Sequence, residues 1–181
     1  MKQIFWNELN EELQKAVSKK GHPFRFFTLA TVGLDNLARL RTVVLRKVSK
    51  NLDLVIYTDK RSKKITHIKE NNKVSLLFYN PEKMLQLKVE GKAEIITDKI
   101  MLNKHWNAIQ INNRKDYITK NAPGSVINNP DAIEYIDSEN HFCMLQIQPF
   151  KIEYLKLKRP NHIRIRFSKL GEKWHEEFLT P

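Results

Sequence analysis

Apolar side chains recur along most of this chain with the two-residue period of β-strands. The segments that alternate in this way, or are continuously apolar, are residues 26–32, 38–48, 52–58, 74–79, 85–97 and 142–157. Residues 162–167 and 172–178 follow as a closing strand pair. Because most neighbours are joined by short polar turns, antiparallel pairing is favoured. We expect a mainly β (α+β) fold, an antiparallel barrel of six or seven strands with peripheral helices.

Three segments have helical periodicity instead. The first is amphipathic, with apolar residues recurring at Phe5, Leu9, Leu13 and Val17. Residues 59–71 and 98–111 are the other two expected helices. Residues 112–140 contain turn signals and are too long for an idle loop, so we expect a short helix and a functional role there.

Length and composition indicate one globular domain spanning residues 1–181. The apolar fraction of 41% is enough for a packed core. No apolar run reaches the roughly 18 residues of a membrane helix. Cys143 is the only cysteine, which excludes an intrachain disulfide and favours a reducing, cytoplasmic setting. The histidines lack metal-ligand spacing, so we expect no metal site.

The net charge of +12 points to an anionic partner without identifying it. Neither a G-x-G-x-x-G nor a G-K-[ST] motif is present, which excludes the common nucleotide-binding loops. A nucleic-acid-binding barrel would need exposed aromatic residues between lysines on one sheet face. The pairs Phe26-Phe27 and Phe78-Tyr79 are more typical of a core, so we do not expect nucleic acid as the partner.

Two arginines flank an apolar strand in Arg41-Thr-Val-Val-Leu-Arg46. Strict alternation places Arg41 and Arg46 on opposite faces unless a bulge intervenes. A guanidinium at a strand end suits a phosphate or the edge of a polar heterocycle. The alternative is a rim arginine paired with a carboxylate.

Residues 57–64, Tyr-Thr-Asp-Lys-Arg-Ser-Lys-Lys, end a strand and open a helix. Four cations, two hydroxyl groups and free helix N–H groups therefore lie within about one turn. Cations oppose the dipole at a helix N-terminus, so a bound phosphate dianion would account for them. The alternative is an exposed basic helix start without a ligand.

Taken in order, these motifs resemble the pyridoxamine 5'-phosphate oxidase family of FMN-binding split barrels. The resemblance rests on RTVVLR at 41–46, YTDKRSKK at 57–64, VSLLFY at 74–79 and QLKVEGKAE at 86–94. It implies a split barrel, an FMN cofactor and a homodimer with flavin sites at the subunit interface.

The resemblance also implies a set of cofactor-binding residues. Arg41, Thr42, Val43, Val44, Leu45 and Arg46 would lie along the flavin and its ribityl chain. Tyr57 and Thr58 would contact the flavin or its phosphate side. Lys63 and Lys64, with Ser62 beside them, would hold the phosphate. Gln86 would reach the ring system, and Arg166 would come from the partner subunit.

The substrate half of the family pattern differs. The family's Tyr-x3-Arg-x3-Ser is not reproduced in residues 105–117, and its Arg-x-His-x-Arg becomes His162-Ile-Arg164-Ile-Arg166. Leu155 stands where an aromatic residue is expected. We therefore expect an FMN-binding flavoprotein, an oxidoreductase with an undefined substrate and unknown catalytic residues. The alternative is a noncatalytic flavin- or haem-binding module.

Overall fold

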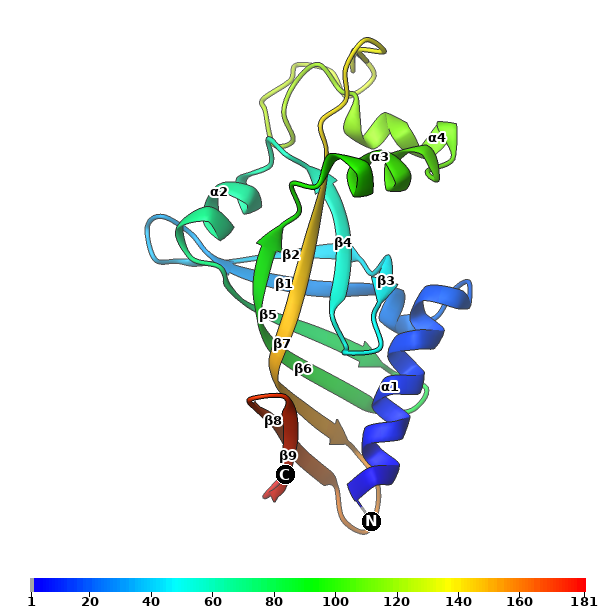
Figure 1. Cartoon of the computed structure of the whole chain (residues 1–181), viewed down its shortest axis with the longest axis vertical. Helices are drawn as coiled ribbons and strands as arrows, with labels where there is room; N and C mark the ends of the chain where they lie inside the picture. Colours follow the sequence, from blue (N-terminus) through cyan, green and yellow to red (C-terminus); the bar gives the residue numbers. More distant parts are fainter. Residues whose placement is uncertain (1) are drawn as a thin grey trace.

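The computed structural model describes residues 2–181 and contains a nine-stranded antiparallel sheet with four α-helices (Figure 1). The helices are α1 (Lys2–Ser18), α2 (Lys63–Glu70), α3 (Lys99–Asn107) and α4 (Ile111–Arg114). The strands are β1 (Phe26–Val32), β2 (Ala38–Val44), β3 (Lys47–Val48), β4 (Leu54–Asp59), β5 (Lys73–Asn80), β6 (Leu85–Ile95), β7 (Phe142–Lys156), β8 (Ile163–Leu170) and β9 (Lys173–Leu179). Two short 3-10 turns, Pro23–Arg25 and Lys115–Tyr117, complete the regular structure.

The strand order explains why the barrel is split. It runs β2-β1-β5-β6-β7-β4-β3, and β8 and β9 extend from the outer part of β7. β2 and β3 lie at opposite ends of this order although they are consecutive in the chain. The backbone crosses between them at Leu45, whose N–H donates to Arg25, and Arg46, whose N–H donates to Val55. At this point β2 and β3 are therefore joined by the continuous backbone and not by a ladder of hydrogen bonds between them.

The mainly β barrel class is confirmed, whereas the strand count is higher than expected. The predicted strand at residues 38–48 is two strands, because the chain leaves β1 at Leu45 and joins β4. The apolar run continues through this crossover, so periodicity alone did not reveal it. The bend predicted at Gly91 is confirmed as a register shift, where a Cβ would come 2.8 Å from the carbonyl oxygen of Gln148.

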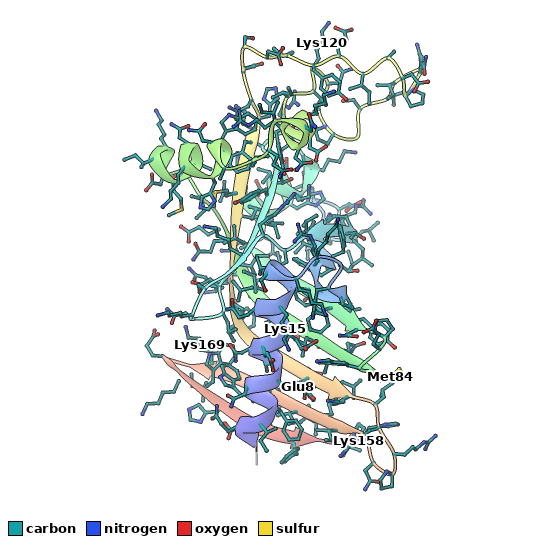
Figure 2. All side chains as sticks on the ribbon, turned by 90° about the vertical axis from the view of Figure 1, so that its right-hand side faces the viewer. Glu8, Lys15, Met84, Lys120, Lys158 and Lys169 are labelled. Carbon is teal, nitrogen blue, oxygen red and sulfur yellow. The ribbon has the colours of Figure 1, made fainter. Side chains whose placement is uncertain are left out.

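Helix α1 covers one face of the lower half of the sheet (Figure 2). The predicted apolar stripe is confirmed, with Leu9 and Leu13 buried and Phe5 and Val17 partly buried against the core. Polar contacts fix the helix, because Glu8 accepts hydrogen bonds from Tyr154 and Lys156. Among residues 2–181, no helix covers the opposite face of these strands.

None of the helices in residues 2–181 is both long and apolar enough to cross a bilayer. Residues 118–140 form an irregular excursion at the far end of the molecule from β8 and β9, and Lys120 marks it in Figure 2. This excursion returns to the barrel where β4 ends and α2 begins.

Candidate functional site

A lysine and two hydroxyl groups meet where β4 passes into α2. Lys64 Nζ donates to Thr58 Oγ1 at 2.8 Å and to Ser62 Oγ at 3.2 Å. Thr58 and Ser62 are buried, and their oxygens lie 3.3 Å apart. β4 delivers Thr58 because its alternation turns this side chain inward, and Ser62 occupies the N-cap position of α2.

Arg41 of β2 lies close enough to Lys64 for the two charges to interact. Burial lowers the pKa of Lys64, and the nearby Arg41 charge lowers it further. Burial also lowers the pKa of Arg41. Within residues 2–181 neither side chain makes an ion pair with a carboxylate. The Asp59 charge opposes these effects on Lys64 but is itself paired with Arg61. Two partly desolvated cations without an ion pair of their own are suited to binding an anion.

The start of α2 adds backbone donors to this site. Ser62 makes no side-chain hydrogen bond to the helix N–H groups, and its hydroxyl accepts from Lys64. The positive end of the helix dipole faces the same region. The structure therefore brings Thr58, Ser62 and Lys64 of the predicted phosphate site together.

The cations of residues 57–64 do not all belong to this site. Arg61 pairs with Asp59 at 2.7 Å and donates to the carbonyl oxygens of Thr119 and Lys120 at 2.8 and 3.0 Å. It therefore anchors the excursion rather than facing an anion. Lys63, the other predicted phosphate ligand, is exposed on α2.

Arg46 and Tyr57 form a second polar cluster below α3. The Arg46 guanidinium lies 5.4 Å from the centre of the Tyr57 ring, and its buried Nε has no hydrogen-bond partner among the described residues. The Tyr57 hydroxyl lies 2.7 Å from His105 Nδ1, whose ring also contacts Lys47. Burial raises the pKa of Tyr57 and lowers that of His105.

The predicted segment 41–46 therefore joins the two clusters. Arg41 belongs to the first and Arg46 to the second. The predicted alternation does not extend to Arg46, because β2 ends at Val44 and the chain crosses to β4 at Leu45. Between them Thr42 is exposed, Val43 and Val44 are partly buried and Leu45 is fully buried. Sequence reasoning missed His105 and Thr31, which contact Tyr57 and Arg41 directly. It also missed Lys47 and His67, which contact His105 and Thr31 in turn.

Gln86 and Arg166 are not brought to these clusters within one chain. Gln86 pairs with Tyr79 and Leu155 across the sheet. Arg166 forms an exposed ion pair with Glu177 at 2.5 Å, on a strand that lies well below α2 (Figure 1). By strand register both face away from α1.

The same uncovered face carries exposed apolar side chains. They come from β1, β2 and β5, and they are Phe26, Leu40, Leu77 and Tyr79. Strand register places them on one continuous surface with Gln86. An apolar sheet face of this kind is typical of a protein–protein contact.

The fold is a split barrel with a cluster of cations at the β4–α2 junction, and comparisons with known proteins identify its family. Residues 4–97 match the family model described as pyridoxamine 5'-phosphate oxidase, FMN-binding domain. Pyridoxine/pyridoxamine 5'-phosphate oxidase 2 of Arabidopsis thaliana is 30% identical, covering 97% of this chain and 96% of its own length. The chain therefore belongs to the pyridoxamine 5'-phosphate oxidase family, whose members are generally dimeric.

Other relatives agree in name or fold. The pyridoxine/pyridoxamine 5'-phosphate oxidase of Thermosynechococcus vestitus is 28% identical, over 85% of this chain and 78% of its own. An FMN-binding protein of Nostoc punctiforme, related to pyridoxamine 5'-phosphate oxidase, superposes with a TM-score of 0.80 at 22% identity, covering 97% and 96% of the two chains. PhzG of Burkholderia lata gives 0.80 at 17% identity, covering 97% and 91%. These last two show the fold.

The described residues fit the cofactor that the matching domain binds. FMN carries a phosphate dianion, which the unpaired Arg41 and Lys64 with Thr58, Ser62 and the start of α2 would accommodate. The orphaned Arg46 Nε supplies a further buried donor. The arrangement offers fixed donors, and the one carboxylate whose charge acts on Lys64, Asp59, is paired with Arg61, as suits a polar, phosphate-bearing ligand.

Proposed function

We propose that this protein is an FMN-dependent oxidoreductase acting on a small molecule that its family membership leaves undefined. The observation that carries the proposal is the pair of desolvated cations, Arg41 and Lys64, which lie beside two buried hydroxyl groups and form no ion pair among residues 2–181. FMN, when bound, supplies the two-electron redox chemistry. The protein supplies binding, orientation and exclusion of water.

The proposed cofactor-binding residues form three groups, according to the part of FMN that each would contact. Arg41, Ser62, Lys64 and Thr58 would hold the phosphate, with Lys63 contributing charge from the surface. Thr42, Val43, Val44 and Leu45 would line the flavin with backbone and apolar atoms. Arg46 and Tyr57 would direct polar groups toward the ring system.

An absorption experiment tests the cofactor. The purified protein is incubated with FMN or with riboflavin, passed through a gel-filtration column and scanned for the flavin band. We expect FMN to be retained and riboflavin to be lost, because the site is built around the phosphate charge. A protein that retains neither flavin would overturn the proposal, and equal retention would place the phosphate elsewhere.

We propose further that the site is completed in a homodimer. The uncovered apolar face with Phe26, Leu40, Leu77 and Tyr79 would be buried against a second copy. Gln86 and Arg166 of the partner subunit would then reach the flavin. The Arg166–Glu177 ion pair is exposed and therefore of low stability, so Arg166 can exchange it for a ligand.

Complementation between subunits tests this arrangement. Lys64→Met and Arg166→Ala chains are produced separately and also co-expressed with different tags, so that the mixed dimer can be isolated. If the site spans two subunits, the mixed dimer has one intact and one doubly altered site and retains half the wild-type FMN. Flavin retention no better than that of either variant alone would show that both residues act within one chain.

The reaction is proposed from the relatives, whose names specify pyridoxine and pyridoxamine 5'-phosphate. This chain lacks the family's substrate-phosphate motif in residues 105–117, so the substrate need not be shared. Reduction of the bound flavin by pyridoxamine phosphate, compared with a panel of amines and reduced nicotinamides, distinguishes a vitamin oxidase from another reductase or oxidase. Flavin that no donor reduces would favour the noncatalytic binding module.

A cytoplasmic setting is part of the proposal. Cys143, the only cysteine of the sequence, is buried, and burial raises its pKa to about 11. Such a thiol is inert and needs no disulfide partner. Fractionation of the source cells with an antibody to the chain tests this location.

A further inference from the structure

A hydrogen-bond chain behind the cation site connects Arg41 to helix α2. Arg41 Nη1 donates to the carbonyl oxygen of Leu29 at 3.2 Å and to Thr31 Oγ1 at 2.8 Å. Thr31 Oγ1 lies 3.0 Å from His67 Nδ1. Thr31 is 2% exposed and His67 is 8% exposed, so water does not compete for these bonds.

The direction of donation along this hydrogen-bond chain follows from the donors that are available. A guanidinium only donates, so Thr31 Oγ1 accepts from Arg41. Among the residues the structure describes, the hydroxyl hydrogen of Thr31 then has a single acceptor within reach, His67 Nδ1. A buried donor without an acceptor is costly, so His67 accepts at Nδ1 and carries its own hydrogen at Nε2.

The surroundings of His67 favour this neutral form. Burial lowers its pKa, and the charges of Arg41, Arg39 and Lys63 lower it further against the opposing effect of Asp35. A proton on Nδ1 would orphan the Thr31 hydroxyl hydrogen and place an imidazolium beside Arg41.

We propose that Thr31 and His67 are positioning residues that hold the Arg41 guanidinium toward the flavin phosphate. Both hydrogens of Nη1 are engaged inside the barrel, which leaves Nη2 and Nε for the ligand. His67 stands three residues after Lys64 on α2, so the chain also fixes the β2 cation relative to the α2 cation. The identity of the anion rests on the proposed function, whereas the hydrogen-bond chain itself does not.

Nitrogen NMR of the flavin-free protein tests the chain directly. We expect the His67 ring at neutral pH to be the Nε2–H tautomer, with Nδ1 shifted by the hydrogen bond from Thr31. Thr31→Val should remove that shift, and Thr66→Val, on the exposed side of α2, should leave it unchanged. An Nδ1–H tautomer or an imidazolium at neutral pH would overturn the proposal.

Flavin affinity tests the positioning role. Thr31→Val keeps the shape of the side chain and should weaken FMN binding on the order of tenfold. Thr31→Ser restores the hydroxyl, and His67→Asn keeps an acceptor near the Nδ1 position, so both should bind FMN within about threefold of wild type. Thermal unfolding of each flavin-free variant separates this effect from loss of fold.

The outcomes are distinguishable from failure of the proposed function. If folded Thr31→Val binds FMN as the wild type does, the positioning role is wrong although the cofactor is right. If the wild type itself binds no FMN, the cofactor proposal and the positioning role both fail, while the tautomer measurement still decides whether the hydrogen-bond chain exists.

Discussion

The same types of charged residue are used in opposite ways in the two halves of the molecule. On the uncovered face of the lower sheet, Lys151 pairs with Glu90 and Arg164 pairs with Glu153, each at 2.8 Å. At the β4–α2 junction, Arg41 and Lys64 lie close enough for their charges to interact, and neither forms an ion pair among residues 2–181, because the nearby Asp59 is paired with Arg61. The number of basic residues therefore does not distinguish a solvated surface from a candidate ligand site. What distinguishes them is whether each basic side chain is paired with a carboxylate.

Arg61 gives the sharpest test of this comparison, because it is a paired cation inside the predicted phosphate motif. Arg61→Ala leaves Asp59, which is 4% exposed, without its counter-charge. We expect a loss of unfolding free energy on the order of 3 kcal/mol. Faster hydrogen exchange should appear in residues 118–136, because the carbonyl contacts to Thr119 and Lys120 disappear.

Urea denaturation and exchange mass spectrometry measure these two effects. Lys60→Ala, at the exposed neighbouring position, is the matched control and should change neither. Unchanged exchange in the excursion would show that Arg61 does not anchor it.

Lys64 and Lys156 allow an unpaired lysine to be compared with an ion-paired one by the same substitution. Lys64→Met should weaken FMN binding by about 2 kcal/mol, or about 30-fold, because one charge-assisted contact is lost. The flavin-free variant should be no less stable than the wild type, since a desolvated cation is removed. Lys156→Met loses the ion pair with Glu8 and should show the reverse, lower stability with unchanged FMN affinity. Flavin titration measures the FMN affinity of both variants, and urea denaturation measures their unfolding free energies.

Acid should weaken the contributions of the buried histidines and of the paired carboxylates in different pH ranges. Burial lowers the pKa of His67 and His105 below 6.5, so the unfolded chain binds more protons and stability falls as the pH drops below that value. Hydrogen bonds from Arg164 and Lys151 lower the pKa of Glu153 and Glu90 below 4.5, so their contribution is present above 4.5 and lost below it.

Unfolding free energies between pH 7 and 3 measure both losses. His67→Asn should reduce the loss of unfolding free energy in the first range and Glu153→Gln that in the second, with the remainder due to His105 and Glu90. Two variants that reduce the loss in the same range would contradict this assignment.

Lys63 should show the smallest effect. It is exposed, so Lys63→Gln should weaken FMN binding by about 0.2–1 kcal/mol. The difference should shrink at high ionic strength, where salt screens exposed charges. A loss as large as that for Lys64→Met, persisting in salt, would mean that Lys63 contacts the phosphate directly.

Periodicity and local charge predicted much of this molecule. The alternating segments gave the barrel class, and the basic helix start identified Thr58, Ser62 and Lys64 as neighbours. The crossover at Leu45 could not be predicted, because an apolar run looks the same whether it pairs with one strand or two. The contacts of Arg61 could not be predicted either, because they are made with residues about 60 positions further along the sequence. His67 had a detectable signal, since it follows Lys64 at helical spacing.

The position of β7 has a consequence for how the molecule is made. This strand pairs with β4, β6 and β8, and it follows β6 only after the long segment that contains α3, α4 and the excursion. During synthesis, β4 and β6 therefore emerge from the ribosome before β7. Until β7 has been synthesised, each of them has one edge without its hydrogen-bonding partner. Such long-range pairing slows folding and leaves strand edges available for aggregation. The nascent chain is consequently at its most vulnerable in the interval between the end of β6 and the completion of β7.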